Sequence, residues 1–356
     1  MRRAALVLAL LLTTACGGGE EEPRTPSAEP PREIEVDASS TLYGFVGDTA
    51  GNPVEGVVVS DGFQCVATDA GGVYEMKRNA AAEYVYYSVP AEFKIRTGHD
   101  GYPDFYVRLD TSQQKIRQDF TLERLAGVER SFRLICIGDP QINEASHAVR
   151  FKEEAGREIR EYAASAGVPC YGITLGDHVN NKWTLFTNMV VALQPEQTGV
   201  PVFATIGNHD HEFPTADEKA ARAKYESYFG PVDYSFNRGD VHVVSMDNVI
   251  HSCKASADYE GGFTAAQYAW LKQDLSFVPK DKMVILCVHI PFRGGWGTNS
   301  AHADADKYYD EVLDLLSQYE YAAIMSAHTH SNINYIHRKN GKEIFEHVTG
   351  TTCGAW

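Results

Sequence analysis

Two patterns of apolar positions divide the chain. Across 41–126 the apolar runs are short, rich in β-branched and aromatic residues, and separated at close intervals by Gly, Asn-Pro and Asp. The segment QKIRQDFTLER near the end of this region alternates apolar and polar positions. Short strands with regular turn signals are typical of an all-β sandwich, so we predict a small all-β module over 41–126.

From about residue 130, continuous apolar runs alternate with helical segments. The runs are FRLICIG, CYGITLG, VFATIG, VHVVSM, MVILCV and AAIMSA. A 3.6-residue spacing predicts a helix after the first run, with Phe151, Ala155, Ile159 and Tyr162 on its apolar face. A second helix is predicted to begin at Thr264 as its N-cap and to carry Tyr268, Leu271 and Leu275. This alternation predicts an α/β fold whose functional groups lie just beyond the C-terminal strand ends.

Five of these runs end in side chains that can ligate a metal or move a proton. The first run is followed by Asp139 and Gln141, the second by Asp177, His178 and Asn180, and the third by Asn208, His209 and Asp210. The fifth run is followed by His289, and the sixth by His328 and His330. One such residue after a strand is ordinary turn chemistry, but five occurrences in the same context are not. We expect these side chains to converge at one edge of the sheet, with Gly207 letting the backbone turn before Asn208.

The ligand types narrow the choice of metal. Carboxylate, imidazole and amide oxygen without thiolate suit Mn²⁺, Fe, Zn²⁺ or Mg²⁺. The number of candidate ligands is too high for one tetrahedral ion. It fits two divalent metal ions about 3.5–4 Å apart that share a carboxylate.

The motifs GDPQ, GDHVN, GNHD, VHIPF and AHTH resemble the ordered motifs of the calcineurin-like metallophosphoesterases, over roughly 133–335. The resemblance implies an α/β domain over 130–356, built as a four-layer β-sandwich flanked by helices, which hydrolyses a phosphomonoester or phosphodiester. It implies a first metal held by Asp139, Gln141, Asp177 and His330, and a second held by Asp177, Asn208, His289 and His328. Asp177 would bridge the two ions.

The resemblance also implies the catalytic roles. His209 would stand off the metals and act as a general acid or hydrogen-bond the phosphoryl group. Asn180 occupies the place where many relatives have an Asp that orients this histidine, and where purple acid phosphatases have Tyr, so it argues against a Tyr–iron charge-transfer site. Gln141 replaces a frequent His and implies looser binding, or a harder ion, at the first site.

The β module resembles the Ig-like, carboxypeptidase-regulatory type found in front of exported bacterial domains, through GNPVEGVVVSDG and ATDAGGVYEM. Such modules are spacers or docking surfaces. Asp48, Asp61 and Asp69 are candidates for Ca²⁺ ligands, but the turn reading is favoured.

Substrate-binding candidates lie outside the metal motifs. Arg293 and Trp296 belong to a Gly-rich loop after His289, where they either contact the substrate or form an ordinary surface loop. His251 and His178 are weaker candidates for phosphate contacts.

The N-terminus is a targeting segment. Residues 1–16 combine Arg2 and Arg3, an apolar core, small residues and Cys16, in the manner of a lipoprotein signal peptide with its lipobox. Cys16 would then be lipidated, although a plain secretory peptide is the alternative. Residues 17–40 are Gly-, Glu- and Pro-rich and are predicted to be a flexible linker. We therefore expect a periplasmic or cell-surface lipoprotein of a Gram-negative bacterium.

Composition limits the partners. The chain has 356 residues and a formal net charge of -16, which argues against nucleic acid and leaves a small phosphorylated substrate held by metals. Cys136 and Cys287 lie in apolar runs and are expected to be buried thiols. The abrupt end in TGTTCGAW suggests a fragment or a natural truncation at the C-terminus. The rival function is a non-catalytic surface protein that binds glycan or a partner, but a scaffold has no need of His209.

Overall fold

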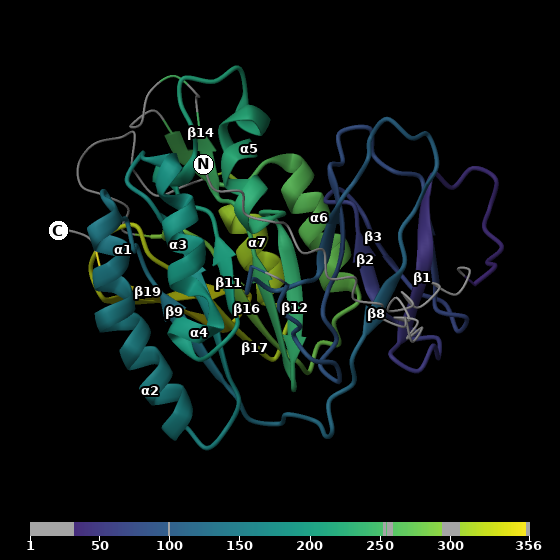
Figure 1. The fold of residues 1–356 in the computed structure, drawn as a ribbon, viewed down its shortest axis with the longest axis horizontal. Helices are drawn as coiled ribbons and strands as arrows, with labels where there is room; N and C mark the ends of the chain where they lie inside the picture. Colours follow the sequence, from purple (N-terminus) through teal and green to yellow (C-terminus); the bar gives the residue numbers. More distant parts are fainter. Residues whose placement is uncertain (1–31, 99, 252–253, 255–258, 294–306, 354–356) are drawn as a thin grey trace, which may run out of the picture. The chain divides into compact units, whose positions relative to one another are not determined.

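The computed structural model describes residues 32–98, 100–251, 254, 259–293 and 307–353 (Figure 1). Residues 34–356 form one compact unit. In the part of the chain that the structure describes, no helix is long and apolar enough to span a membrane.

The N-terminal part of this unit is built from short strands, as predicted. The strands are β1 (Leu42–Asp48), β2 (Val58–Ser60), β3 (Cys65–Ala67), β4 (Val73–Met76), β5 (Tyr84–Tyr87), β6 (Tyr106–Arg108), β7 (Ile116–Arg117) and β8 (Phe120–Leu122). They form two sheets, one with the order β4-β1-β7 and β8 paired to β1, the other with the order β3-β2-β5-β6. The carboxylates of Asp48, Asp61 and Asp69 accept backbone N–H bonds within their own turns, which accounts for them as turn residues.

The second part contains a three-stranded parallel sheet and a six-stranded mixed sheet, with the orders β11-β10-β9 and β12-β13-β16-β17-β19-β18. Their strands are β9 (Arg133–Ile137), β10 (Cys170–Leu175), β11 (Val202–Thr205), β12 (Tyr234–Arg238), β13 (Val241–Ser245), β16 (Met283–Cys287), β17 (Tyr321–Ser326), β18 (Ile333–Lys339) and β19 (Lys342–Val348). A separate hairpin pairs β14 (Val249–His251) with β15 (Tyr259–Gly261). All six predicted apolar runs are strands.

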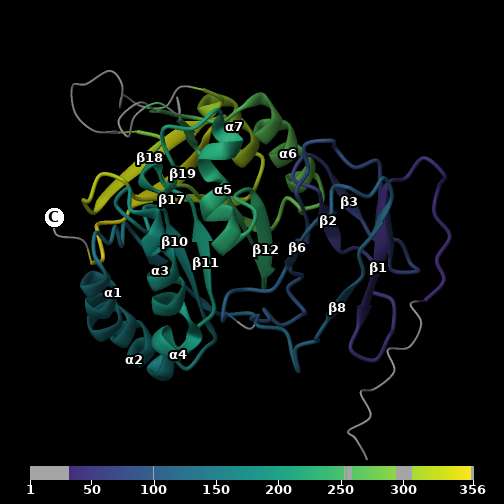
Figure 2. The same ribbon diagram turned by 45° about the horizontal axis from the view of Figure 1, so that its top comes forward.

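Helices flank the two sheets. They are α1 (Ala145–Phe151), the π-helical η1 (Lys152–Gly156), α2 (Arg157–Ser165), η2 (Trp183–Leu185), α3 (Phe186–Leu193), α4 (Pro195–Thr198), η3 (Asn208–Asp210), α5 (Glu218–Phe229), α6 (Ala265–Ser276) and α7 (Tyr309–Leu316). Figure 2 shows α1 to α4 on the side of β10 and β11, with α6 and α7 toward the six-stranded sheet. The sheets face each other, since the rings of Phe203 and Phe236 stack at 4.0 Å and the hydroxyls of Thr205 and Ser245 lie 2.9 Å apart. The layered α/β prediction is confirmed.

The predicted helices are present with one error. Thr264 caps α6 as expected, because its hydroxyl accepts the Gln267 N–H and the Gln267 side chain accepts the Thr264 N–H. In the helix after β9, Phe151 is fully buried, but Tyr162 is 49% exposed and does not belong to the apolar face. The π-helical turn of η1 between these positions inserts extra backbone per turn, and this shifts the later residues around the axis.

The β module packs directly on the second part of the chain. The Trp270 indole N–H donates to the Ser60 hydroxyl over 3.0 Å, and the Tyr86 hydroxyl donates to the Asp233 carbonyl over 2.5 Å. The five described cysteines are free thiols. Cys287 is fully buried as predicted, whereas Cys136 in β9 is only partly buried.

Candidate metal centre

The predicted ligands gather at the C-terminal ends of five strands, but these strands belong to two sheets. Asp139 follows β9, Asp177 follows β10 and Asn208 follows β11, all in the three-stranded sheet. His289 follows β16 and His328 follows β17, both in the six-stranded sheet. The expectation of a single sheet edge is therefore corrected: the site lies where the edges of two facing sheets meet.

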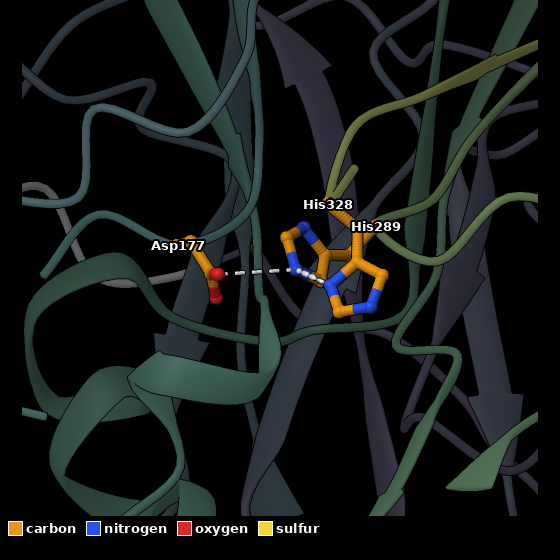
Figure 3. A group of neighbouring side chains, drawn as sticks. All are labelled: Asp177, His289 and His328. Atoms are coloured by element: carbon orange, nitrogen blue, oxygen red, sulfur yellow. Dashed lines mark hydrogen bonds and ion pairs between the residues drawn. The ribbon is translucent and has the colours of Figure 1, made fainter. Parts of the chain in front are cut away.

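Three buried side chains form the middle of the site. Potential ligand atoms of Asp177, His289 and His328 all lie within 4.8 Å of one another (Figure 3). His289 Nε2 is 3.3 Å from Asp177 Oδ2 and 3.2 Å from His328 Nδ1. Such convergence of imidazole and carboxylate groups is suited to a divalent transition metal ion.

The other four predicted ligands surround this trio. Asn208 Oδ1 is 2.9 Å from His289 Nε2, and Gln141 Nε2 is 3.4 Å from Asp177 Oδ2. Asp139 Oδ1 is 3.7 Å from His330 Nε2. The structure thus brings all seven side chains together, and their division between two ions stays a prediction.

Strained backbone marks the same loops. Asp139, Gln141, Asp177, His328 and His330 all have φ between 40° and 67°. L-residues rarely adopt this left-handed conformation, and it costs about 1–3 kcal/mol at each position. The fold tolerates this cost at five of the seven candidate ligands, as expected where a site fixes the direction of its side chains.

Unsatisfied polar atoms fit a bound cation. Among the described residues, Asp139 Oδ1 and Gln141 Oε1 are buried and have no hydrogen-bond donor. Burying an oxygen without a partner costs free energy, and a cation between these acceptors would remove that cost. The His289 Nδ1–H donates to the Leu175 carbonyl over 2.7 Å, which leaves Nε2 as the ligand atom.

Two glycines allow the loops to approach closely. A Cβ on Gly176, where φ is 93°, would lie 2.4 Å from His289 Nδ1. A Cβ on Gly207 would lie 2.3 Å from Asp177 Oδ1. Since Gly207 has φ of -123°, which any residue can adopt, close packing rather than the expected turn requires glycine there.

The charges of the site are unbalanced without a cation. Burial raises the pKa of Asp139 well above its ordinary value, and the charge of Asp177 adds to this. Burial lowers the pKa of His289, but the neighbouring Asp177 and Asp139 outweigh it and raise this pKa to about 9. Burial would raise the pKa of Asp177, yet His289 and His209 hold it below its ordinary value. A bound dication would replace the proton on His289.

His209 lies beside the metal ligands, with a different partner from the one predicted. Its ring Nδ1 is 2.8 Å from Asn181 Oδ1, not from Asn180. The prediction of Asn180 as the orienting residue is wrong, because the backbone turns at Asn181, where φ is 54°. The Asn180 N–H donates to the Ile142 carbonyl instead. The His209 N–H donates to Asp177 Oδ1 over 2.8 Å.

His178 and Asp210 support the loops from behind. The Asp210 carboxylate accepts the N–H groups of Gly207, His178 and Val179. The His178 ring is fully buried, contacts Asp210 Oδ2 at 2.9 Å and stacks on Phe229 at 4.6 Å. A phosphate contact by His178 is therefore excluded in this conformation.

Two further candidates for substrate contacts, His251 and Arg293, lie among the described residues. His251 is buried in β14 and stacks on His211 at 5.8 Å and on Phe213 at 5.8 Å. Arg293 is exposed at the end of the described segment after His289. Trp296 and Cys16 lie outside the described residues.

Sequence reasoning missed several residues of this site. The Asn248 carboxamide oxygen accepts the N–H groups of His289 and Ile290, and the Tyr259 hydroxyl lies 3.4 Å from His328 Nε2. The Trp183 indole N–H donates to the His209 carbonyl over 3.2 Å. Asn248 could have been predicted from the sequence, because it comes shortly after the apolar run VHVVSM, just as the candidate ligands come after the other apolar runs.

Comparison with known proteins agrees with the geometry. A family model described as "Calcineurin-like phosphoesterase" matches residues 132–332, and "N terminal of Calcineurin-like phosphoesterase" matches residues 40–125. Purple acid phosphatase 23 of Arabidopsis thaliana is 26% identical over 181 residues, which cover 46% of this chain and 36% of that protein. Purple acid phosphatase 18 of the same plant is 25% identical over 182 residues, which cover 48% and 38%.

The chain spans little more than a third of the length of these two relatives. Among solved structures, a 5'-nucleotidase from Candida albicans aligns over 64% of this chain and 47% of that one, with 12% identity and a TM-score of 0.37. The phosphoesterase match alone covers more than half of the chain. The chain therefore belongs to the calcineurin-like phosphoesterases, which are metal-dependent phosphoric ester hydrolases.

Proposed function

We propose that this chain hydrolyses a phosphomonoester or phosphodiester with the help of two divalent metal ions. The observation that carries the proposal is the convergence of seven ligand-type side chains, with His209 held beside them by Asn181. The names of the two plant relatives favour a phosphomonoester, although they match less than half of this chain.

The ligand set suits a phosphate ester. Two divalent ions bring four positive charges, and among the proposed ligands only Asp139 and Asp177 are carboxylates. The site would therefore keep a net positive charge for the anionic substrate. When bound, the ions would neutralise phosphoryl oxygens and make a coordinated water more acidic.

His209 is proposed to act on the substrate directly. Its Nδ1 is engaged by Asn181, so Nε2 is the ring nitrogen that can face the phosphoryl group. From there it can donate a proton to the leaving oxygen or a hydrogen bond to the phosphoryl group. Asp177 orients this histidine as well, through the His209 backbone N–H.

The test is metal analysis combined with hydrolysis of p-nitrophenyl phosphate and bis(p-nitrophenyl) phosphate. The wild type is expected to bind metal and to turn over at least one of the two esters. Asp177→Asn is expected to lose metal and activity, and His209→Ala is expected to lose activity alone. A wild type that binds metal and hydrolyses neither ester would contradict the proposal.

We also propose that the protein is exported and anchored in a membrane through lipidated Cys16. The support is the order of Arg2 and Arg3, the apolar core and the small residues before Cys16. Cys16→Ser is expected to move the protein from the membrane fraction to the soluble fraction. Retention of this variant in the membrane fraction would argue against a lipid anchor.

A further inference from the structure

His211 is fully buried behind the turn that carries Asn208 and His209. Its Nδ1 lies 2.9 Å from the Gly207 carbonyl oxygen, and its Nε2 lies 3.3 Å from Asp247 Oδ2. Both neighbours are acceptors, whereas a neutral imidazole has only one N–H. The two contacts together therefore require a second proton, which His211 and Asp247 share.

The surroundings favour this proton. Burial lowers the pKa of His211, but the adjacent Asp247 outweighs it and raises this pKa above the ordinary value. Asp247 is 3% exposed, and its second oxygen accepts the Val249 N–H over 3.0 Å. Four other charged or titratable groups lie nearby. Arg222 is 3.6 Å from Asp247 Oδ2, and Glu218 is 4.0 Å from His211 Nε2. The ring of His251 stacks on that of His211, and Asp233 Oδ1 accepts the Asp247 N–H.

The Gly207 carbonyl determines where the turn lies. The same oxygen accepts the Asp210 N–H over 3.1 Å, and the Gly207 N–H donates to Asp210 Oδ2 over 3.0 Å. Gly207 packs closely on Asp177, because an added Cβ would lie 2.3 Å from the Asp177 carboxylate oxygen. A bond that fixes the Gly207 carbonyl also fixes the two residues that follow it.

We propose that His211 is a positioning residue, which ties the Gly207 carbonyl to the Asp247 carboxylate and thereby fixes Asn208 and His209 relative to Asp177. The inference rests on the proposed function, in which His211 touches neither metal nor substrate. It assigns a role to the second histidine of GNHDH, for which the sequence offered none.

The chain contains a matched control. His242 is also a buried histidine between two acceptors, 2.8 Å from Asn237 Oδ1 and 2.8 Å from Asp274 Oδ2. It lies near the start of β13, and both of its acceptors lie outside the turn that carries Asn208 and His209. Replacing either histidine by Phe removes the same two contacts and keeps a ring.

The experiment measures kcat, KM, Mn²⁺ affinity and thermal midpoint for the wild type, His211→Phe, His242→Phe and Asp247→Asn. His211→Phe is expected to lower kcat and Mn²⁺ affinity by about tenfold or more, with KM little changed, since supporting residues of metal sites have effects of about 10–100-fold. His242→Phe is expected to lower the thermal midpoint but to leave kcat and Mn²⁺ affinity unchanged. Asp247→Asn is expected to keep kcat and Mn²⁺ affinity closer to the wild type than His211→Phe does, because its carboxamide can donate to a neutral His211, while the thermal midpoint falls because Arg222 loses its ion pair with this carboxylate.

Nitrogen-15 NMR of the His211 ring supplies a readout besides activity. At pH 7 the wild type is expected to show protons on both ring nitrogens, and Asp247→Asn a proton on Nδ1 alone. The proposal is overturned if His211→Phe keeps wild-type kcat and Mn²⁺ affinity, or if His242→Phe loses them equally. If the wild type binds Mn²⁺ but hydrolyses neither ester, the proposed function fails, while Mn²⁺ affinity and ring protonation still test His211.

Discussion

At the scale of single residues, the neighbouring Asn208 and His209 have different proposed roles, because their side chains contact different partners. The Asn208 side chain contacts His289 at 2.9 Å, within the set of predicted ligands. The next residue, His209, donates its backbone N–H to Asp177 and directs its ring to Asn181. One turn thus supplies a metal ligand and a group for the substrate.

Asn181→Ala is expected to lower kcat by about tenfold or more with metal content unchanged, because His209 loses the bond that orients its ring. Steady-state kinetics and metal analysis check this. Asn180→Ala is the control, since the Asn180 contact with Ile142 uses only the backbone. Equal losses in both variants would contradict the assignment of Asn181.

The sequence was sufficient to predict the candidate ligands, but not the residues that hold the ligand loops and His209 in place. Asp177, Asn208 and His289 follow continuous apolar runs, so their position at strand ends could be read directly. The choice between Asn180 and Asn181 depends on a positive φ at Asn181, and neither periodicity nor composition specifies it. Likewise, nothing local indicates that His211 reaches Asp247, 36 positions away.

Metal affinity is expected to rise with pH, by at least about tenfold per unit between pH 6 and 8. Without metal, Asp177 and Asp139 raise the pKa of His289 to about 9, so below this pH the ring carries a proton that the metal must displace. Competition titrations with a chelating dye at several pH values measure this. Affinity that does not change over this range would contradict His289 as a ligand.

At the scale of elements, helix α5 carries charge into the contact with the β module. The Tyr84 hydroxyl donates to the Glu226 carbonyl, and Lys219 pairs with Glu83. Burial raises the pKa of Glu226 to about 7, against the opposing effect of Arg222 at 3.2 Å. Helix α5 therefore contributes buried acid groups that prefer to be protonated.

Glu226→Gln is expected to gain stability relative to the wild type as pH rises. An acid whose pKa is higher in the folded chain contributes most below its unfolded pKa of 4.5, and this contribution is lost as pH rises to about 7. The side chain is 10% exposed, and the shift corresponds to about 3 kcal/mol. Urea unfolding of both proteins at pH 4.5 and pH 8 measures the difference. A difference that is the same at both pH values would contradict this account.

Most elements were predictable because their patterns are local. The parallel strands are continuous apolar runs, and the capping pair Thr264 and Gln267 lies three residues apart. The outward position of Tyr162 could not be predicted from the sequence, because the π-helical turn changes which residues share a face of the helix.

At the scale of the whole molecule, the β module and the phosphoesterase region share buried contacts. The Ser235 hydroxyl contacts Ser88 at 2.9 Å, and the Asn237 N–H donates to the Val89 carbonyl over 2.8 Å. The Arg238 guanidinium donates to the Phe93 carbonyl over 2.6 Å. These contacts join positions more than 140 residues apart. The local pattern of apolar positions therefore predicted the two regions, but not how one region packs against the other.

We expect residues 34–356 to unfold in one cooperative transition, because separation of the two regions would expose Trp270 and leave Arg238 without its carbonyl acceptors. Differential scanning calorimetry, followed in parallel by near-UV circular dichroism, checks this. Two resolved transitions would show that the regions fold independently.

The central claim is that the edges of two sheets assemble a metal centre with a separate catalytic histidine. Metal stoichiometry and ester turnover, measured together for the wild type, Asn208→Ala and His209→Ala, test it most directly. The account predicts two metal ions in the wild type, fewer in Asn208→Ala, and in His209→Ala two ions with turnover reduced by about 100-fold or more. It would be contradicted if His209→Ala lost metal as Asn208→Ala does, or kept the turnover of the wild type.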